Sequence, residues 1–101
     1  MALAHHVFFS LKNSSPEAID QLLSACKKYL TIQPGIISFA CGTREKTLER
    51  DVNITDWDVS LHIIFAEKKY HDDYQIDHTH EQFVAENKDN WSKVQVFDSI
   101  I

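Results

Sequence analysis

The residues of this chain best suited to chemistry are its histidines and one tyrosine. Six of the 101 residues are histidine. His80 comes three residues after Asp77, and an aspartate ahead of an amphipathic segment is a common helix N-cap. Because the positive end of a helix dipole disfavours an imidazolium, we expect His80 to be neutral at about pH 7. A neutral imidazole can remove a proton from a carbon next to a carbonyl group.

Tyr74 is the expected partner of His80. It ends the helical segment before Asp77, so its ring can approach His80 across the break between two helices. There its hydroxyl can hold the imidazole or donate to a developing enolate oxygen. We expect the two side chains to come within about hydrogen-bonding reach, with looser geometry or one bridging water in the unliganded protein. The residues alone leave a second interpretation open, in which His80 packs at a helix start and Tyr74 fills a gap in the core.

The remaining histidines carry weaker signals. His6 and His62 are predicted on one face of a sheet and can meet near a dimer axis; an ion is conceivable there, but no spacing typical of metal ligands supports one. His78 and His80 are two residues apart on a helix and therefore point in different directions. His71 lies in a charged run and is predicted to be solvated. We therefore assign no metal and no other cofactor.

Length and composition predict one domain without a membrane or nucleic-acid role. A chain of 101 residues forms a single domain over 1–101. Ten Lys and Arg against 15 Asp and Glu leave a formal net charge of −5, which argues against binding a phosphate backbone. No apolar run approaches the roughly 18 residues that span a bilayer, and the first residues do not resemble a signal peptide. The two cysteines, Cys26 and Cys41, suit a reducing compartment, so we expect a cytoplasmic protein.

The spacing of apolar residues predicts a succession of strands and helices. Alternation of apolar and polar residues predicts strands, whereas recurrence every three or four residues predicts helices. A charged stretch over 43–56 is predicted to be a long connection or an arm. The predicted strands are 3–11, 36–42, 57–65 and 92–101, and the predicted helices are 15–31, 66–76 and 77–90.

This order of elements predicts an α+β protein with the ferredoxin-like βαββαβ arrangement, a four-stranded antiparallel sheet with helices on one face. Alternation places Trp57 on the same face as Val59. In the strand over 36–42, it places Ile37 with Phe39 on one side and Ile36 on the other. The helix-covered face is predicted to carry Val7, Phe9, Phe39, Val59, Leu61, Ile63, Val94 and Val96.

The opposite face of the predicted sheet mixes apolar and polar residues. It is too apolar to be left in water and too polar for a sealed core. Such a face suits a half-wet interface, and the simplest partner is a second copy of the chain related by a two-fold axis. We therefore expect a homodimer, whose interface includes His6, Phe8, Ser10, Ser38, Ala40, Ser60, His62, Ile64, Gln95 and Phe97.

Several local strings, in their order and spacing, resemble one protein family. They are the opening run over 5–12, the turn at Pro34-Gly35-Ile36, the strand start at Trp57-Asp58-Val59 and the run from Tyr74 to Asp98. Together they resemble the stress-responsive α/β-barrel (Dabb) domain over nearly the whole chain. The resemblance implies a dimer in which two ferredoxin-like sheets close into a barrel.

Plant polyketide cyclases of this family perform an aldol condensation without a metal or organic cofactor. The resemblance implies that His80 is a catalytic histidine and that Tyr74 is its tyrosine partner. This sequence departs from the cyclase at Cys26 and Val59, which replace a tyrosine and a histidine, and at His78, which replaces a proline. The resemblance also implies a pocket for a small hydrophobic ligand at His5, Cys26, Phe83, Trp91, Val94 and Val96, with Asp98 at or beside it, and strand alternation adds Val7, Phe9 and Leu61.

Three functions remain open at this point. One is cofactor-free binding or conversion of a small hydrophobic carbonyl compound, with His80 and Tyr74 in a pocket. The second is a non-catalytic dimer acting in stress tolerance or assembly, and the third is a cofactor-independent monooxygenase. The first requires a cavity of roughly 300 Å³ or more. The second expects Phe9, Leu23, Phe83 and Trp91 to fill that space.

Overall fold

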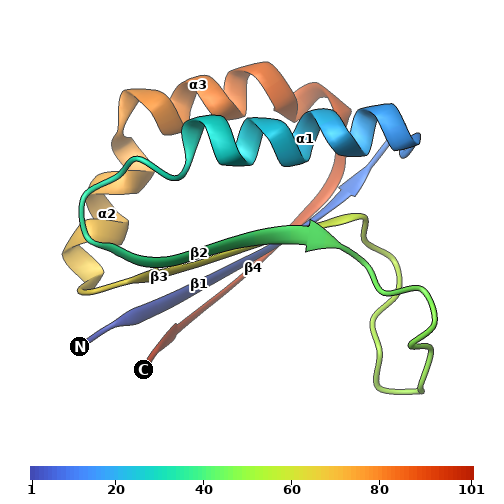
Figure 1. Ribbon diagram of the computed structural model, residues 1–101, viewed down its shortest axis with the longest axis horizontal. Coiled ribbons are helices and arrows are strands. Elements are labelled where there is room, and N and C mark those ends of the chain that lie inside the picture. The colour runs from blue at the N-terminus through green and yellow to red at the C-terminus, as the bar shows by residue number, and fades with distance from the viewer.

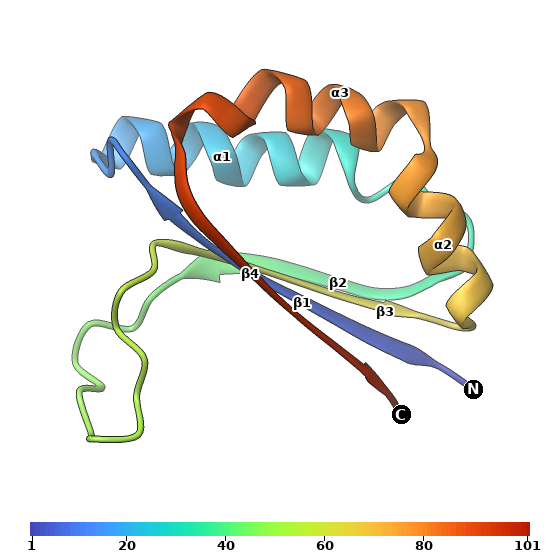
Figure 2. The ribbon, with the colours of Figure 1, turned by 180° about the vertical axis from the view of Figure 1, so that it is seen from behind.

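The computed structural model describes residues 1–101 as a twisted antiparallel sheet with three helices packed on one face (Figures 1 and 2). The strands are β1 (Leu3–Leu11), β2 (Ile36–Thr43), β3 (Val59–Phe65) and β4 (Trp91–Ile100). The helices are α1 (Pro16–Tyr29), α2 (Lys68–Ile76) and α3 (His78–Asn87), followed by a 3₁₀ turn at Lys88–Asn90. The strand order is β2-β3-β1-β4, with every pair antiparallel, which confirms the predicted α+β class and ferredoxin-like arrangement.

Helix α1 begins where its capping residues predict. The Ser15 hydroxyl accepts a hydrogen bond from the Ala18 backbone N–H at 3.2 Å, and Pro16 occupies the first turn, where no N–H is needed. Helices α1 and α3 lie side by side over the sheet (Figure 1). The Tyr29 hydroxyl at the end of α1 donates to the Glu86 carboxylate of α3 at 2.7 Å, which joins the two helices.

The core lies between the helices and the two central strands, β1 and β3. Every second residue of β3 points toward the helices, and these side chains, Val59, Leu61, Ile63 and Phe65, are at most 1% exposed. Val94 and Val96 of the edge strand β4 pair with Phe9 and Val7, so they share this face but stay partly open to solvent. None of the helices has the length and apolar character needed to cross a membrane.

Strand β2 departs from simple alternation. A bulge between Ile36 and Ser38 places one extra residue against β3. Ile36 therefore lies opposite Phe65 and packs against the core, whereas Ile37 is 63% exposed. The prediction had these two isoleucines on the wrong faces, because a bulge reverses the alternation that precedes it.

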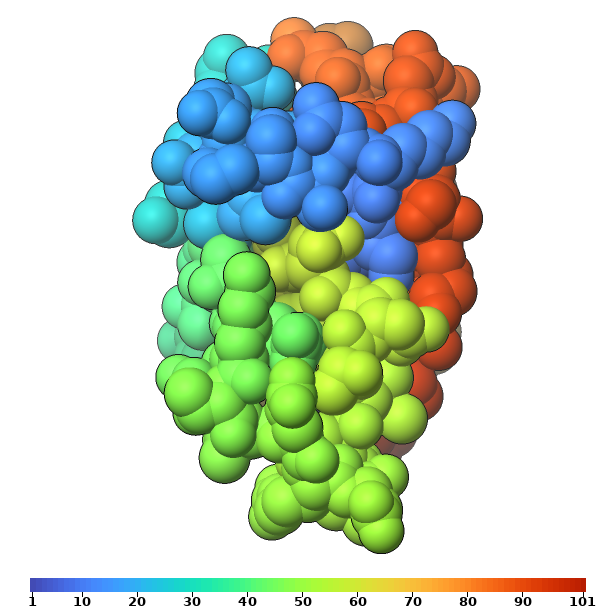
Figure 3. Space-filling model, turned by 90° about the vertical axis from the view of Figure 1, so that its right-hand side faces the viewer, coloured from blue at the N-terminus to red at the C-terminus, as the bar shows by residue number.

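Residues 44–58 form an arm that extends from the end of the sheet, away from the helices (Figure 3). Trp57 lies at the end of this arm rather than in β3, and its ring meets the edge of Phe8, with ring centroids 5.0 Å apart. Its indole N–H donates to the Ile54 carbonyl at 2.8 Å. The prediction that Trp57 shares a face with Val59 was wrong, because strand alternation does not extend into the arm.

Candidate functional site

A cavity of about 180 Å³ lies between the sheet and the helices α2 and α3. Strands β1, β3 and β4 supply the residues on its sheet side, and the helices supply most of the others. Its lining is mainly apolar, with His5, Tyr74, Gln75 and His80 as the polar members. The apolar lining residues are Val7, Phe9, Leu61, Phe83, Trp91, Val94 and Val96, all of them expected, together with Val84, which the sequence did not single out.

Cys26 is the one expected lining residue that the structure places elsewhere. Cys26 belongs to α1, and its side chain is fully buried in the core between this helix and the sheet. It does not line the cavity. Burial raises the pKa of its thiol to about 12, so the group stays protonated and behaves as a small apolar side chain. The expected contact between Cys26 and a ligand is therefore corrected.

Asp77 fixes the position of His80. The Asp77 carboxylate accepts the Thr79 backbone N–H at 2.9 Å and so caps α3, as predicted. The Gln33 side chain donates to the same carboxylate at 3.0 Å and ties the cap to the turn after α1. His80 is consequently held in the first turn of α3, facing the cavity.

Burial keeps the imidazole of His80 in its neutral form. Removal from water lowers the pKa of His80, and the nearby imidazoles of His5 and His71 lower it further. The carboxylates of Asp77 and Glu81 oppose this shift with smaller effects. The neutral state expected from the helix dipole is thus reinforced by desolvation, and a neutral imidazole is the form that accepts a proton.

Tyr74 contacts His80 through ring edges. The two ring centroids are 4.7 Å apart and the planes are inclined by 65°. No direct hydrogen bond joins the two side chains, which meet through this edge contact. The Tyr74 side chain is 1% exposed, and burial raises the pKa of its hydroxyl, which therefore stays protonated as a hydrogen-bond donor.

His5 is paired with a carboxylate from the neighbouring strand. Its Nδ1 lies 2.5 Å from the Asp98 Oδ1 atom, across the β1–β4 ladder. Burial lowers the pKa of His5, although the Asp98 carboxylate favours the charged form and opposes that shift. His5 therefore lines the cavity as expected, and its hydrogen-bond partner is the Asp98 carboxylate.

His71 was missed by sequence reasoning. Its side chain is only 15% exposed, and its ring lies 4.8 Å from the His5 ring between centroids. The charged neighbours Lys68 and Asp72 suggested a solvated residue, but only one face of α2 meets water. The available signal was the spacing to Tyr74, since residues three apart share a helix face and Tyr74 points inward.

The sheet face away from the helices carries the second pair of histidines. His6 and His62 face each other with 2.8 Å between their Nδ1 atoms, and His62 Nε2 lies 2.9 Å from the Ser60 hydroxyl. Beside them Phe8, Trp57 and Phe97 surround a hollow of about 360 Å³. This mixture of aromatic and polar groups agrees with the face expected to meet a second copy.

A larger hollow, of about 540 Å³, lies between the start of α1 and the arm over 44–58. Its lining is mostly polar and contains no histidine. Two of its acidic groups already hold the backbone and arm in place, since Asp58 accepts the Leu11 N–H at 2.8 Å and Asp56 pairs with Lys93. The smaller cavity therefore remains the better candidate site, because the neutral imidazoles gather there.

Comparison with known proteins gives the family and the fold. The family model of the stress-responsive A/B barrel domain matches residues 3–101. A search of curated protein sequences found no match to the chain.

The solved structures that share the fold include a Dabb-family protein, a dimeric protein of unknown function and a lyase. A Dabb-family protein with a ferredoxin-like fold from Mesorhizobium loti is 22% identical with a TM-score of 0.80, covering 99% of this chain and 96% of that one. A dimeric ferredoxin-like protein of unknown function from Thermobifida fusca is 15% identical with a TM-score of 0.82, covering 100% and 92%. The hydroxynitrile lyase from Passiflora edulis is 19% identical with a TM-score of 0.79, covering 99% and 93%. At these identities the comparisons establish a common fold.

Proposed function

Because the chain belongs to the stress-responsive α/β-barrel (Dabb) family, we propose that it is a homodimeric barrel that converts a small hydrophobic carbonyl compound without a cofactor. The imidazole of His80 is the proposed base, and the hydroxyl of Tyr74 is the proposed hydrogen-bond donor. The observation that carries the proposal is the edge contact between the His80 and Tyr74 rings at the wall of a mainly apolar cavity. The proposed homodimer is supported by the dimeric Thermobifida fusca relative.

The proposed reaction begins with proton removal. Neutral His80 takes a proton from the carbon next to a carbonyl, the electron pair of the broken C–H bond enters an enolate, and the imidazole becomes an imidazolium. The Tyr74 hydroxyl donates a hydrogen bond to the enolate oxygen. The enolate carbon then attacks a second carbonyl, and the resulting alkoxide takes the proton from the imidazolium. This last step regenerates the neutral base.

The size of the cavity limits the proposed substrate. The cavity of about 180 Å³ is smaller than the roughly 300 Å³ expected for a substrate pocket, so that expectation was wrong. The proposed substrate is therefore a small carbonyl compound, no larger than a simple cyclic ketone. The Passiflora edulis relative is a hydroxynitrile lyase, and hydroxynitriles are adducts of carbonyl compounds. This likeness supports small carbonyl chemistry as the class to test.

Deuterium exchange tests the proposed first step separately from any later one. The full-length protein is incubated in D₂O with cyclohexanone, and deuterium uptake at the carbon next to the carbonyl is followed by NMR. We expect His80→Ala to reduce protein-dependent exchange about 10²–10⁴-fold. Its free energy of unfolding should change by less than about 1 kcal/mol, because His80 makes no side-chain hydrogen bond and is only half-buried.

His78→Ala is the matched control, because His78 lies two residues away on the same helix and is exposed to solvent. It should keep the wild-type exchange rate. Equal losses in His78→Ala and His80→Ala, or a wild-type protein without exchange, would contradict the proposed base.

A non-catalytic dimer is the second candidate, and one observation favours it. The aromatic rings of Phe9, Phe83 and Trp91 pack together at the cavity, with Phe9 and Trp91 centroids 4.9 Å apart. These rings occupy much of the space that a larger substrate would need. A protein that forms a dimer and shows no exchange with any small ketone or aldehyde would favour this second function.

A further inference from the structure

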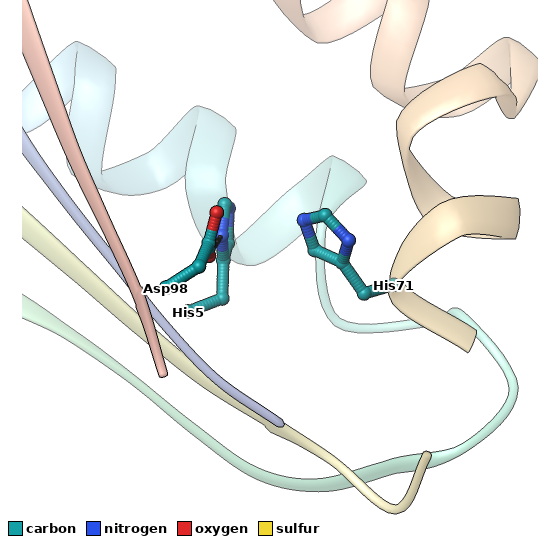
Figure 4. Close-up of side chains that lie close together, drawn as sticks. All are labelled: His5, His71 and Asp98. Atoms are coloured by element: carbon teal, nitrogen blue, oxygen red, sulfur yellow. Dashed lines mark hydrogen bonds and ion pairs between the residues drawn. The ribbon is translucent and has the colours of Figure 1, made fainter. Parts of the chain in front are cut away.

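Three potential metal ligands converge beside the cavity from three separate elements. They are His5 of β1, His71 of α2 and Asp98 of β4 (Figure 4). One ligand atom from each residue lies within 4.8 Å of the others. His5 and Asp98 stand side by side on the sheet, and the His71 ring faces them from the helix (Figure 4).

The hydrogen bonds of His71 leave one nitrogen available to the cluster. Its Nδ1 lies 3.3 Å from the Asp72 carboxylate, which can only accept, so the Nδ1–H donates there. In the neutral ring the lone pair then belongs to the other nitrogen, which faces His5 and Asp98 (Figure 4). A carboxylate on the outer nitrogen is the arrangement that orients histidines bound to metals.

One hydrogen bond joins His5 to Asp98, and a metal ion can replace its proton. The His5 Nδ1 atom lies 2.5 Å from the Asp98 Oδ1 atom, and each of the two residues offers one ligand atom to the cluster. Without that proton the pair presents one lone pair of nitrogen and one anionic oxygen toward the same point. His5 is nearly fully buried, whereas the Asp98 side chain is 40% exposed, so an ion can reach the cluster from the Asp98 side.

We propose that His5, His71 and Asp98 bind a divalent transition-metal ion of the Zn²⁺ type at the end of the cavity. Two imidazoles and a carboxylate suit Zn²⁺, with metal–ligand distances of about 2.0–2.2 Å. Ligand atoms around a tetrahedral ion stand about 3.3 Å apart, so the His5–Asp98 pair opens slightly and the His71 ring moves inward by roughly 1–1.5 Å. The fourth position is left for water or for a ligand in the cavity that His5 lines.

The inference goes beyond the proposed function and does not depend on it, since His80 and Tyr74 are not among the ligands. The proposed proton transfer by His80 likewise requires no metal. His6 and His62, on the other side of the sheet, offer only two imidazoles and a hydroxyl, a poorer set for the same ion. The pair nevertheless has to be tested, because two imidazoles in contact can hold adventitious metal.

Equilibrium dialysis of the full chain, free of affinity tag and pretreated with a chelator, tests the site with Zn²⁺ alone. We expect one Zn²⁺ per chain. His71→Ala and Asp98→Asn should each weaken binding by about 100-fold. His62→Ala and His78→Ala are the controls and should leave the affinity unchanged. Co²⁺ replaces Zn²⁺ in a parallel experiment, where its visible absorption reports nitrogen and oxygen ligands directly.

The outcomes separate the inference from its alternatives. Absence of Zn²⁺ binding, or binding that His62→Ala abolishes and His71→Ala retains, would overturn it. Thermal unfolding of each metal-free variant checks that the fold is kept, and His71→Gln replaces His71→Ala if the latter unfolds. The ketone-exchange assay on metal-free protein tests the proposed function by itself, so one hypothesis can fail while the other stands.

Discussion

His80 and Tyr74 meet edge to face across the break between α2 and α3, with their ring centroids 4.7 Å apart. The break is local in origin. The Asp77 N–H bonds to the Tyr74 carbonyl at 3.3 Å at the end of α2, while the Asp77 carboxylate caps α3. One residue therefore ends one helix and begins the next, and it turns both rings toward the same cavity.

Two substitutions of Tyr74 separate its chemistry from its packing. The hydroxyl makes no hydrogen bond within the chain, so Tyr74→Phe should change the free energy of unfolding by less than about 1 kcal/mol. It should lower ketone exchange about 10²–10³-fold. Tyr74→Ala should instead cost about 3–5 kcal/mol, because it empties a buried position. Urea unfolding and NMR exchange measure the two effects, and full exchange in Tyr74→Phe would make Tyr74 a packing residue only.

A negative charge on the sheet face away from the helices should prevent formation of the homodimer. Phe8→Asp places a carboxylate among the rings of Trp57 and Phe97 and should give monomer or aggregate. The neighbouring His62 has a pKa lowered by burial and therefore offers no positive charge to pair with it. Ser24→Asp puts the same charge on the exposed side of α1 and should leave the dimer intact. Sedimentation velocity at micromolar concentration measures both. A monomeric wild-type protein would contradict the dimer itself.

The two glycines should respond oppositely to alanine. Gly35 has φ +81°, and a Cβ there would lie 2.1 Å from the Tyr70 ring. Gly35→Ala should therefore destabilise the protein by at least about 1–2 kcal/mol from backbone strain alone. Gly42 lies in β2 with open space around it, so Gly42→Ala should be neutral or slightly stabilising. Thermal and urea unfolding compare them, and equal effects would argue against the turn geometry at Gly35.

Stability should decline as the pH falls below about 6.5, the ordinary pKa of histidine, because burial lowers the pKa of His5, His62 and His80. Below that pH the unfolded chain binds protons that the folded chain does not, so the free energy of unfolding decreases until the folded-state pKa values are reached. Above about pH 6.5 these three histidines are neutral in both the folded and the unfolded chain, so they no longer change the free energy of unfolding with pH. Urea unfolding at fixed protein concentration measures the trend, and His80→Gln should flatten it. A stability that rises on acidification through this range would contradict the assigned direction.

Much of the fold can be predicted from local sequence patterns. Alternation in β1 and β3, the Ser15 and Asp77 caps and the apolar stripe of α1 depend on neighbours within a few residues, so they can be read from the sequence. The position of His80 follows from the Asp77 cap in the same way. The strand residues of the cavity wall were also predictable, because strand alternation assigns side chains to a face, whereas Phe83 and Trp91 were implied by the family resemblance.

Only the tertiary structure brought His71 and Asp98 to His5. His5 and Asp98 are 93 positions apart in the sequence, and their contact depends on the register between β1 and β4, which the packed sheet decides. The His71 side chain is mostly shielded from solvent because its side of α2 packs against the sheet. The charged residues next to it in the sequence give no indication of which side of the helix that is. The bulge at Ile36 and the placement of Trp57 have the same origin, since long-range packing overrides local alternation where the two conflict.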